Sequence, residues 1–229
     1  MNAETDEGII LRVHSLTETS LVIRWLTAAN GRIATVARGA RNPKSPFAGR
    51  LDLFFTAALS FQRSRRSELH ALREVSVIGT FPGLRTDFAR LSQASYAVGL
   101  VELVTETETP VPEIHQLCLD FLRHLEASPC RPRSVFALET RILAADGLDP
   151  AGAESIPDPD ALQLVTALRD ESWESLANLE PSPDAARAVN RLLKAQLRNH
   201  WGRIPRGRDA AITGSLHSPG PADAPAAVP

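Results

Sequence analysis

Basic side chains gather in the first third of the sequence, at spacings that suit contact with a polyanion. Between residues 24 and 73 there are ten lysines and arginines but only two acidic residues, Asp52 and Glu68. A basic surface of this kind predicts a nucleic acid or another polyanion as the ligand, and the alternative is an arginine-rich face that serves only solubility. The residues expected to make the contact are Arg24, Arg32, Arg38, Arg41, Lys44, Arg50, Arg63, Arg65 and Arg66.

A second basic group lies near the end of the sequence. No acidic residue occurs between positions 185 and 208, and the basic residues recur three or four positions apart, which places them on one face of a helix. The group predicts a secondary basic patch, either a second polyanion contact or a solubilising face that complements the acidic middle of the chain. Its members are Arg187, Arg191, Lys194, Arg198 and Arg203.

Catalytic and metal-binding patterns give no convincing site. The sequence has no GxSxG, phosphate-binding GxxxxGK[ST], HExxH or dinucleotide fingerprint, and its six histidines are scattered. Cys118 and Cys130, the two cysteines, do not form a pair with metal-ligand spacing. We therefore expect no catalytic residue, no cofactor and no metal; a hydrolase or nuclease with an unrecognised site is the remaining enzymatic alternative.

The N-terminus and the hydropathy pattern favour a cytoplasmic protein. MNAETDEG is acidic where a signal peptide would be basic and then apolar, and no apolar run approaches the roughly 18 residues that a membrane span needs. Two cysteines are too few for a disulfide framework, as expected in a reducing compartment.

The elements that must position the first basic group are short strands. An Asn30-Gly31 pair predicts a type I′ hairpin between the second and third of them, and the connection from the third to the fourth is the longest. Five such strands predict an OB-fold barrel, in which ligands lie across strands two and three; an SH3-like or other small barrel is the alternative. The strands are expected at 8–13, 21–26, 32–40, 53–62 and 68–78.

Aromatic side chains are interleaved with the arginines, and stacking on bases is one role they could have. Most of these aromatic residues, which include Trp25 and Phe54, are instead expected in the core, and alternation along the strands turns Phe55 and Phe61 inward. Phe47 lies in a loop between small residues, and it is the one with the best case for exposure.

From residue 80 the pattern becomes helical. Thr86 or Asp87 can cap a first helix with apolar positions from 88 to 101, and further helices are expected at 114–125 and 134–145, the last ended by Gly147. Cys118 falls on an apolar stripe and is expected to be buried. After a loop at 146–160 come helices near 161–168, 173–179 and 184–201, and the composition beyond residue 209 predicts disorder.

The segment GIILRVHSLTETSLVIRWLTAANGRIATVARGARNPKSPFAGRLDLF resembles the amino-terminal domain of the RecO family of bacterial recombinational repair proteins. The resemblance rests on Gly8 to Leu11, Gly31 to Ile33, Ala37 to Arg41, Lys44-Ser45, Gly49 and Leu51, and it extends more weakly through FPGLRTDFARLSQASYAVGLVELV to RLLKAQLRNHWGRIPRGR.

The resemblance implies an α+β, multidomain protein: an OB-fold at 1–79, an all-α helical domain at 80–208 and a disordered tail at 209–229. It implies binding of single- and double-stranded DNA, strand annealing, and loading of RecA, indirectly, with RecR and the C-terminal tail of the single-stranded-DNA-binding protein as partners near the nucleoid. Many relatives hold zinc with four cysteines where this chain has the cysteine-free loop 146–160, so no structural metal is expected. The alternative function is an adaptor whose basic surfaces dock acidic proteins.

Overall fold

A computed structural model describes residues 3–152, 156 and 158–214. The chain divides into two compact units. The first, here called the barrel unit, combines Met1–Phe81 with Val104–Leu119, and the second, the helical unit, combines Pro82–Leu103 with Asp120–Pro229. The run from 104 to 119 groups with the barrel rather than with the helices that precede and follow it.

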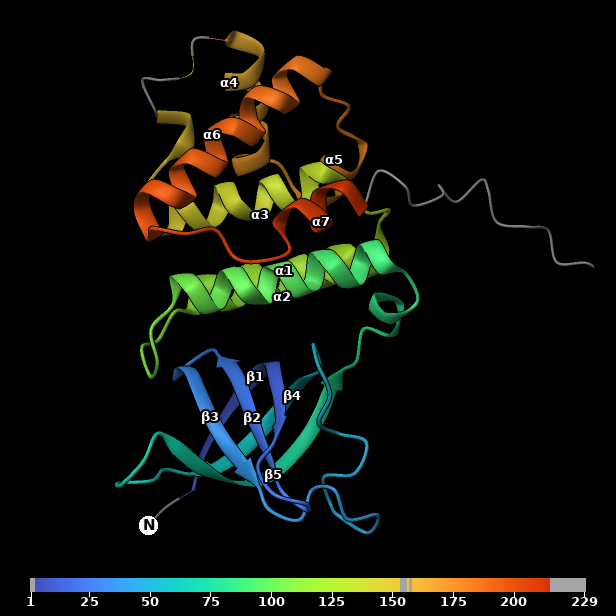
Figure 1. Cartoon of the computed structure of the whole chain (residues 1–229), viewed down its shortest axis with the longest axis vertical. Helices are drawn as coiled ribbons and strands as arrows, with labels where there is room; N and C mark the ends of the chain where they lie inside the picture. The colour runs from blue at the N-terminus through green and yellow to red at the C-terminus, as the bar shows by residue number, and fades with distance from the viewer. Residues whose placement is uncertain (1–2, 153–155, 157, 215–229) are drawn as a thin grey trace, which may run out of the picture. The chain divides into compact units, whose positions relative to one another are not determined.

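The barrel unit is a five-stranded closed barrel with neighbours in the order β1-β2-β3-β5-β4 (Figure 1). All neighbouring strands are antiparallel except β3 and β5, which run parallel. A small five-stranded barrel followed by helices confirms the predicted fold class, an OB-fold before an all-α part. The strands are β1 (Glu4–Ser15), β2 (Leu21–Thr27), β3 (Gly31–Ala37), β4 (Thr56–Gln62) and β5 (Leu69–Gly79).

Two strand boundaries differ from the prediction because backbone turns interrupt the apolar pattern. β3 ends at Ala37 rather than at residue 40, since Gly39 has φ +66° and turns the chain. β4 begins at Thr56 rather than at residue 53, since Phe54 has φ 66° and its N–H donates to the carbonyl of Ile10 at 2.9 Å. Apolar residues at such turns look like strand in the sequence.

The predicted type I′ turn between β2 and β3 is wrong, although the hairpin itself forms. Thr27 pairs with Gly31, and of Asn30 and Gly31 only Gly31 has a positive φ, at +65°. The carboxylate of Asp6 holds the turn by accepting from the Ala29 and Asn30 N–H groups at 3.1 and 3.0 Å. The conformation of this turn is therefore held by Asp6 of β1, and the Asn30-Gly31 pair alone does not determine it.

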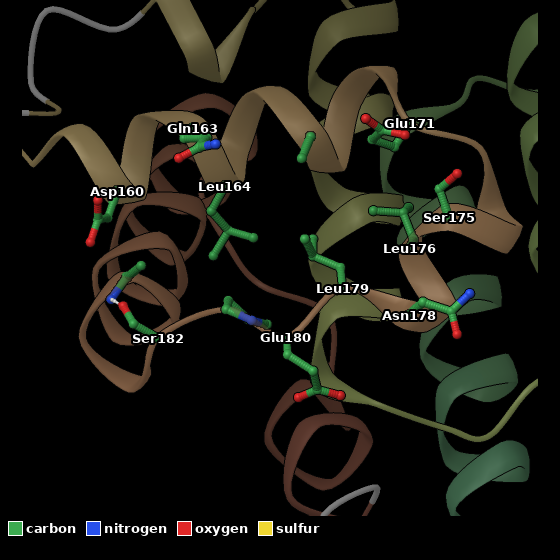
Figure 2. A pocket seen from close by; sticks show the side chains of 13 residues that line it. Asp160, Gln163, Leu164, Glu171, Ser175, Leu176, Asn178, Leu179, Glu180 and Ser182 are labelled. Carbon is green, nitrogen blue, oxygen red and sulfur yellow. Dashed lines mark hydrogen bonds between the residues drawn. The ribbon is translucent and has the colours of Figure 1, made fainter.

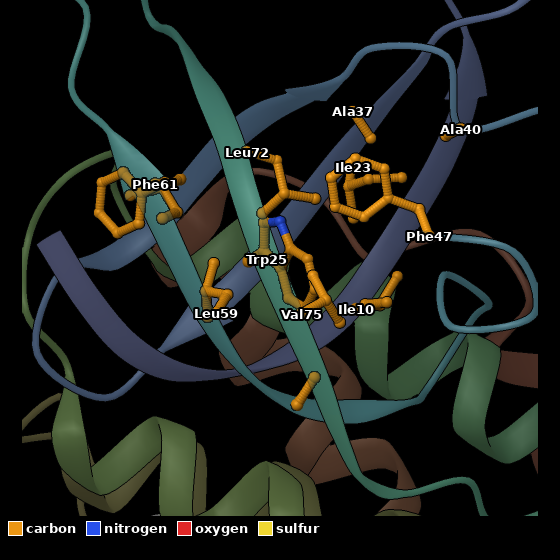
Figure 3. Close-up of a cluster of buried hydrophobic side chains, with 12 residues drawn as sticks. Ile10, Ile23, Trp25, Ala37, Ala40, Phe47, Leu59, Phe61, Leu72 and Val75 are labelled. Atoms are coloured by element: carbon orange, nitrogen blue, oxygen red, sulfur yellow. The ribbon is translucent and has the colours of Figure 1, made fainter. Parts of the chain in front are cut away.

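The barrel interior is filled by alternate side chains of the strands (Figure 3). Trp25 and Phe61 are fully buried, and the indole N–H of Trp25 donates to the Thr35 hydroxyl at 2.8 Å. Phe47 folds back from its loop onto this core and keeps only 7% of its surface exposed. Phe47 is therefore a packing residue, and the reading of it as an exposed stacking platform is wrong.

The helical unit is built around α3, which is buried on nearly all sides, as expected for a helix at the centre of a bundle. α4, α5, α6 and α7 contact it. Side chains of Asp87, Ser172 and Ser182 accept hydrogen bonds from backbone N–H groups at the starts of α1, α5 and α6. The helices are α1 (Phe88–Val104), α2 (Pro112–Ala127), α3 (Pro132–Ala145), α4 (Pro159–Asp170), α5 (Trp173–Asn178), α6 (Pro183–Trp201) and α7 (Arg208–Thr213), with 3₁₀ turns at Pro82–Arg85 and Pro150–Gly152.

Helix α7 corrects the predicted start of the C-terminal tail, because it covers residues that were assigned to disorder. The rest of that segment, from 215 to 229, lies outside the described residues, as do 153–155 and 157 of the predicted loop. Gly147 has φ +80° and ends α3 as expected. No helix among the described residues has the length and apolar character to cross a membrane.

Candidate nucleic-acid interface

The outer face of β2 and β3 carries an exposed arginine. Alternation turns Ile23 and Trp25 inward and Arg24 outward, opposite Ala34 of β3. On its other side Arg24 stands opposite Arg12 of β1, after a register shift between Ile10 and Arg12. Two basic side chains therefore lie next to each other on the β1–β2 part of this face.

A basic loop lies at one end of this face. Arg38, Arg41 and Lys44 follow β3 directly and are exposed. The N–H of Arg41 donates to the carbonyl of Thr19 at 3.0 Å, which fixes the loop against the connection between β1 and β2. In an OB-fold that connection borders the ligand surface.

A second basic loop, residues 63–68 between β4 and β5, lies toward the other end of β3. The parallel pairing of Leu69 with Ala34 begins at the middle of β3, so the loop that precedes β5 is directed toward the start of β3. Arg65 and Arg66 are exposed, and the Ser64 hydroxyl accepts from the N–H groups of Arg66 and Ser67, both at 3.2 Å. Exposed arginines thus stand at both ends of the β2–β3 face.

Arg63 is engaged within the barrel unit instead of projecting from it. Its guanidinium pairs with both carboxylate oxygens of Glu4 at 2.9 and 3.0 Å, with Glu108 at 2.8 Å and with the Asn30 side-chain oxygen at 2.7 Å. The hydrogen bond to Arg63 lowers the pKa of Glu4, and the same bond raises the pKa of Arg63. Arg63 therefore joins β1, the β2–β3 turn and the segment around Glu108.

Arg32 and Arg50 are also held by backbone carbonyls. Arg32 is half-buried and donates to the carbonyl of Thr105 at 2.6 Å, while its own carbonyl accepts from the Glu108 N–H at 2.8 Å. Arg50 is exposed but donates to the carbonyl of Val75 at 3.1 Å and lines a groove formed by β1, β4 and β5. The barrel thus gathers Arg24, Arg38, Arg41, Lys44, Arg65 and Arg66 around β2–β3 and places Arg32, Arg50 and Arg63 in other roles.

The structural roles of Arg12, Glu108 and His70 in the barrel unit were not identified from the sequence. Arg12 was hidden by the register shift, because the apolar run before it gives no sign of a bulge. Glu108 lies 2.8 Å from the buried His70 through Oε1 and Nε2, in addition to its pair with Arg63. No local signal links positions so far apart in the chain, although the polar triplet Glu106–Glu108 after a helix could have been marked as a possible cap.

On α6 the side chains of Arg187, Arg191, Lys194 and Arg198 are exposed and those of Val189, Leu193 and Leu197 are buried, and Arg187 pairs with Asp184 of the same helix. Arg203 follows Gly202, which ends the helix with φ +73°. A groove of about 480 Å³ beside Arg187 and Arg191 has an apolar lining that includes Ala161, Val189 and Leu192.

Neither cysteine is suited to act as a nucleophile. Cys118 and Cys130 are buried, and burial raises the pKa of each thiol to about 12. The buried position of Cys118 confirms its assignment to the core. Within the described ranges no group of three or more histidine, cysteine or acidic side chains is placed to hold a metal ion; the prediction that the protein has no structural metal stays a prediction.

Two family models match successive parts of the chain. "Recombination protein O N terminal" matches residues 1–81, and "Recombination protein O C terminal" matches residues 85–156. The chain belongs to the RecO family. The first match coincides with the strands of the barrel, and the second begins at the first helix.

Curated relatives carry the same name. Proteins named "DNA repair protein RecO" are 34% identical over 143 residues in Anaeromyxobacter sp. (strain K), 32% over 145 in Syntrophus aciditrophicus and 30% over 144 in Bacillus subtilis (strain 168). These matches cover 62–63% of this chain and 56% of each relative. The chain therefore aligns with a little over half the length of the curated relatives it matches.

Proposed function

We propose that this RecO-family chain acts in DNA repair and recombination by binding single- and double-stranded DNA without reading its sequence and by annealing complementary strands. The observation that carries the proposal is the pair of exposed basic loops, residues 38–44 and 63–68, at the two ends of the β2–β3 face with Arg24 between them. Contacts from such side chains go to phosphates, which are the same in every sequence.

The burial of aromatic side chains supports annealing in particular. Trp25, Phe47, Phe54 and Phe61 are buried, Phe55 and Phe81 are half-buried, and no phenylalanine, tyrosine or tryptophan among the described residues 3–81 is fully exposed. Without a stacking platform, bases of a bound strand stay free to pair with a second strand. A basic surface also lowers the repulsion between two phosphate backbones, so binding and pairing can proceed together.

The partners belong to the same proposal. We infer that the chain works with RecR in the cytoplasm, at the nucleoid, to load RecA on DNA covered by the single-stranded-DNA-binding protein, without catalytic chemistry of its own. The groove beside Arg187 and Arg191 is where we place the acidic, aromatic-ended tail of that protein, since its lining is partly apolar and Arg191 is exposed there. Arg187 pairs with Asp184 in the same lining, and Asp158 adds a second carboxylate, so Arg191 is the cation that would meet the tail.

The decisive experiment compares two charge-matched triple variants. Arg38→Ala/Arg41→Ala/Lys44→Ala removes three cations from the barrel, and Arg187→Ala/Arg191→Ala/Lys194→Ala removes three from α6. Affinity for a labelled single strand and the rate of annealing are measured across a salt series. If three phosphate contacts are lost, the slope of log K against log salt falls by about 2 in the barrel variant.

The α6 variant is expected to keep most of the DNA slope and to lose binding of an acidic peptide that ends in phenylalanine. Unchanged DNA binding and annealing in the barrel variant would refute the assignment of the site. The adaptor alternative is separated by competition: short single-stranded DNA displaces an acidic protein partner from the barrel if DNA is the ligand, and leaves it bound if the surface serves protein docking.

A further inference from the structure

The helical unit contains a second groove, whose charge is opposite to that of the basic surfaces. It has a volume of about 620 Å³ and lies between α4, α5 and the residues that lead into α6 (Figure 2). Leu164 and Leu176 form its base, and the half-buried Leu179 and Pro181 continue the apolar surface outward. Nothing in the proposed DNA binding uses this groove.

The walls of the groove are fixed from behind by two arginines of α3. Arg133 donates to the carbonyls of Leu176, at 2.7 Å, and of Ala177, near the end of α5. Arg141 donates to the carbonyls of Leu168, at 3.0 Å, and of Glu171, at the end of α4. Because cations suit helix C-termini, these contacts hold α4 and α5 in place, and the groove is preformed.

The rim of the groove is acidic. Its lining includes Asp160, Glu171 and Glu180 but no lysine, arginine or histidine. Glu180 lies 3.3 Å from Arg133, whereas no ion pair joins the carboxylate of Asp160 or Glu171 to another described residue. A surface with unpaired carboxylates around an apolar base repels a phosphate backbone and attracts cations.

The spacing along α4 defines what would fit. Asp160, Leu164 and Ala167 follow one another at four and three positions and so share one face of α4, and Glu171 is the residue that directly follows the helix. With a rise of about 1.5 Å per residue, the backbone positions of Asp160 and Glu171 are roughly 16 Å apart along the helix axis, with the apolar side chains between them. A helix with basic residues eleven positions apart and leucines between them is complementary to this pattern.

We propose that the groove docks a basic amphipathic helix of a partner protein. Its arginines or lysines pair with Asp160 and Glu171, and its apolar side chains cover Leu164, Leu176 and Leu179. This assigns the helical unit a docking site for a cationic partner, in a groove separate from the one beside Arg187.

The test uses the full chain and a labelled helical probe of about 16 residues, with arginines eleven positions apart and leucines four and seven positions after the first. A second probe carries glutamates in place of the arginines. Asp160→Lys/Glu171→Lys reverses the rim charge, Ala167→Trp fills the groove without changing its charge, and Glu174→Lys reverses an exposed carboxylate of α5 outside the lining. Thermal unfolding verifies that each variant is folded.

Fluorescence anisotropy is expected to show binding of the arginine probe and not of the glutamate probe. Roughly tenfold weaker binding is expected for both groove variants and less than about twofold for Glu174→Lys, with DNA affinity not reduced in any of them. Equal binding of the two probes, or wild-type affinity in both groove variants, would overturn the proposal. Concentration-dependent self-association that Asp160→Lys/Glu171→Lys abolishes would also overturn it, in favour of a second copy of this chain as the occupant.

Discussion

At the scale of single residues, the decisive distinction is between arginines that face solvent and arginines that hold the fold together. Arg63 and Arg65 lie two positions apart in the same loop, yet Arg63 is surrounded by Glu4, Glu108 and Asn30 while Arg65 is exposed. A guanidinium already paired with two carboxylates has little left to offer a phosphate. Arg63 therefore supports the barrel, whereas Arg65 is left available for the ligand contact proposed above.

This division predicts different losses for Arg63→Ala and Arg65→Ala. Arg63→Ala should lower the free energy of unfolding by about 1–2 kcal/mol, because it removes two partly exposed ion pairs. Arg65→Ala should leave it within about 0.5 kcal/mol and reduce the salt slope for single-stranded DNA by about 0.7. Urea unfolding and salt-dependent anisotropy measure the two quantities. A reduced slope with unchanged stability in Arg63→Ala would return Arg63 to the DNA-contacting set.

Arg208 is an arginine of the helical unit that also holds the fold together. Its guanidinium is buried and pairs with both oxygens of Glu139 at 2.7 and 2.8 Å, and the Tyr96 hydroxyl donates to Glu139 at 2.5 Å. Burial beside Glu139 raises the pKa of the Tyr96 hydroxyl. Arg208 therefore connects α7 to α1 and α3.

Removal of Arg208 should be among the most damaging single changes in the protein. Arg208→Ala leaves Glu139 charged and buried without its partner, a change that costs about 3–5 kcal/mol. Arg206→Ala, an exposed arginine two positions earlier, should cost less than about 0.5 kcal/mol. Chemical denaturation of both variants checks the contrast, and similar stability of the two would mean that the buried pair adds nothing to the fold.

At the scale of secondary-structure elements, local patterns predict most strands and helices, and long-range contacts decide their ends. The alternation of apolar residues in 32–37 was sufficient to predict β3, and the helical spacing in 114–125 was sufficient to predict α2, since each pattern marks a single buried face. The turn at Asn30-Gly31 could not be predicted in the same way, because its contacts come from distant parts of the chain. Asp6 accepts a hydrogen bond from the Asn30 N–H, and the backbone of Thr109 lies against Gly31.

Gly31 tests that long-range contact. A Cβ at Gly31 would overlap the carbonyl oxygen of Thr109, whereas one at Gly49, which has a similar φ of +70°, would meet nothing within 4 Å. Gly49→Ala should therefore cost only the backbone term of about 1–2 kcal/mol. Gly31→Ala should cost at least about 2 kcal/mol more, since residues 105–109 must shift. Equal losses in urea unfolding would show that the approach of Thr109 does not constrain the hairpin.

The contact among α2, α3 and α5 in the helical unit should respond to acid through His124. Its ring stacks on Trp173 with centroids 5.0 Å apart and lies 2.9 Å from the Ser134 hydroxyl, and burial together with the charges of Arg141 and Arg133 lowers its pKa to about 4. Between pH 6.5 and 4 the unfolded chain binds a proton that the folded chain does not, so stability falls as the pH falls through this window.

The expected loss from this one group is up to about 3 kcal/mol at the acidic end. His124→Gln should flatten the dependence of unfolding free energy on pH between 6.5 and 4, and His14→Gln, at an exposed position, should leave it unchanged. Urea unfolding at a series of pH values provides the comparison. A pH dependence in His124→Gln equal to that of the wild type would exclude His124 as the acid-sensitive group.

At the scale of the whole molecule, a net charge of −2 conceals separate basic and acidic surfaces. The sequence revealed the basic stretches because they are continuous in the chain, and it predicted the barrel that arranges the first of them. It did not reveal which arginines are neutralised, because Glu4 and Glu108 reach Arg63 from 59 and 45 positions away. The acidic groove was hidden for the same reason, since its lining comes from three segments of the helical unit.

The absence of fully exposed phenylalanine, tyrosine or tryptophan side chains from the described residues 3–81 leads to a prediction for the intact protein. If the proposed interface contacts only phosphates, the affinities for oligo(dT) and oligo(dA) should be similar at a given salt concentration. Ala34→Trp adds a stacking platform beside Arg24 on the β2–β3 face, and it should strengthen binding of single strands by about 1–3 kcal/mol while leaving duplex binding nearly unchanged. Ala34→Leu, which adds apolar volume without a ring, is the control. Bases that stack on the added ring are less free to pair, so Ala34→Trp should also catalyse strand annealing more slowly than the wild type. Faster annealing by this variant would refute the mechanism in which unstacked bases allow the bound strand to pair.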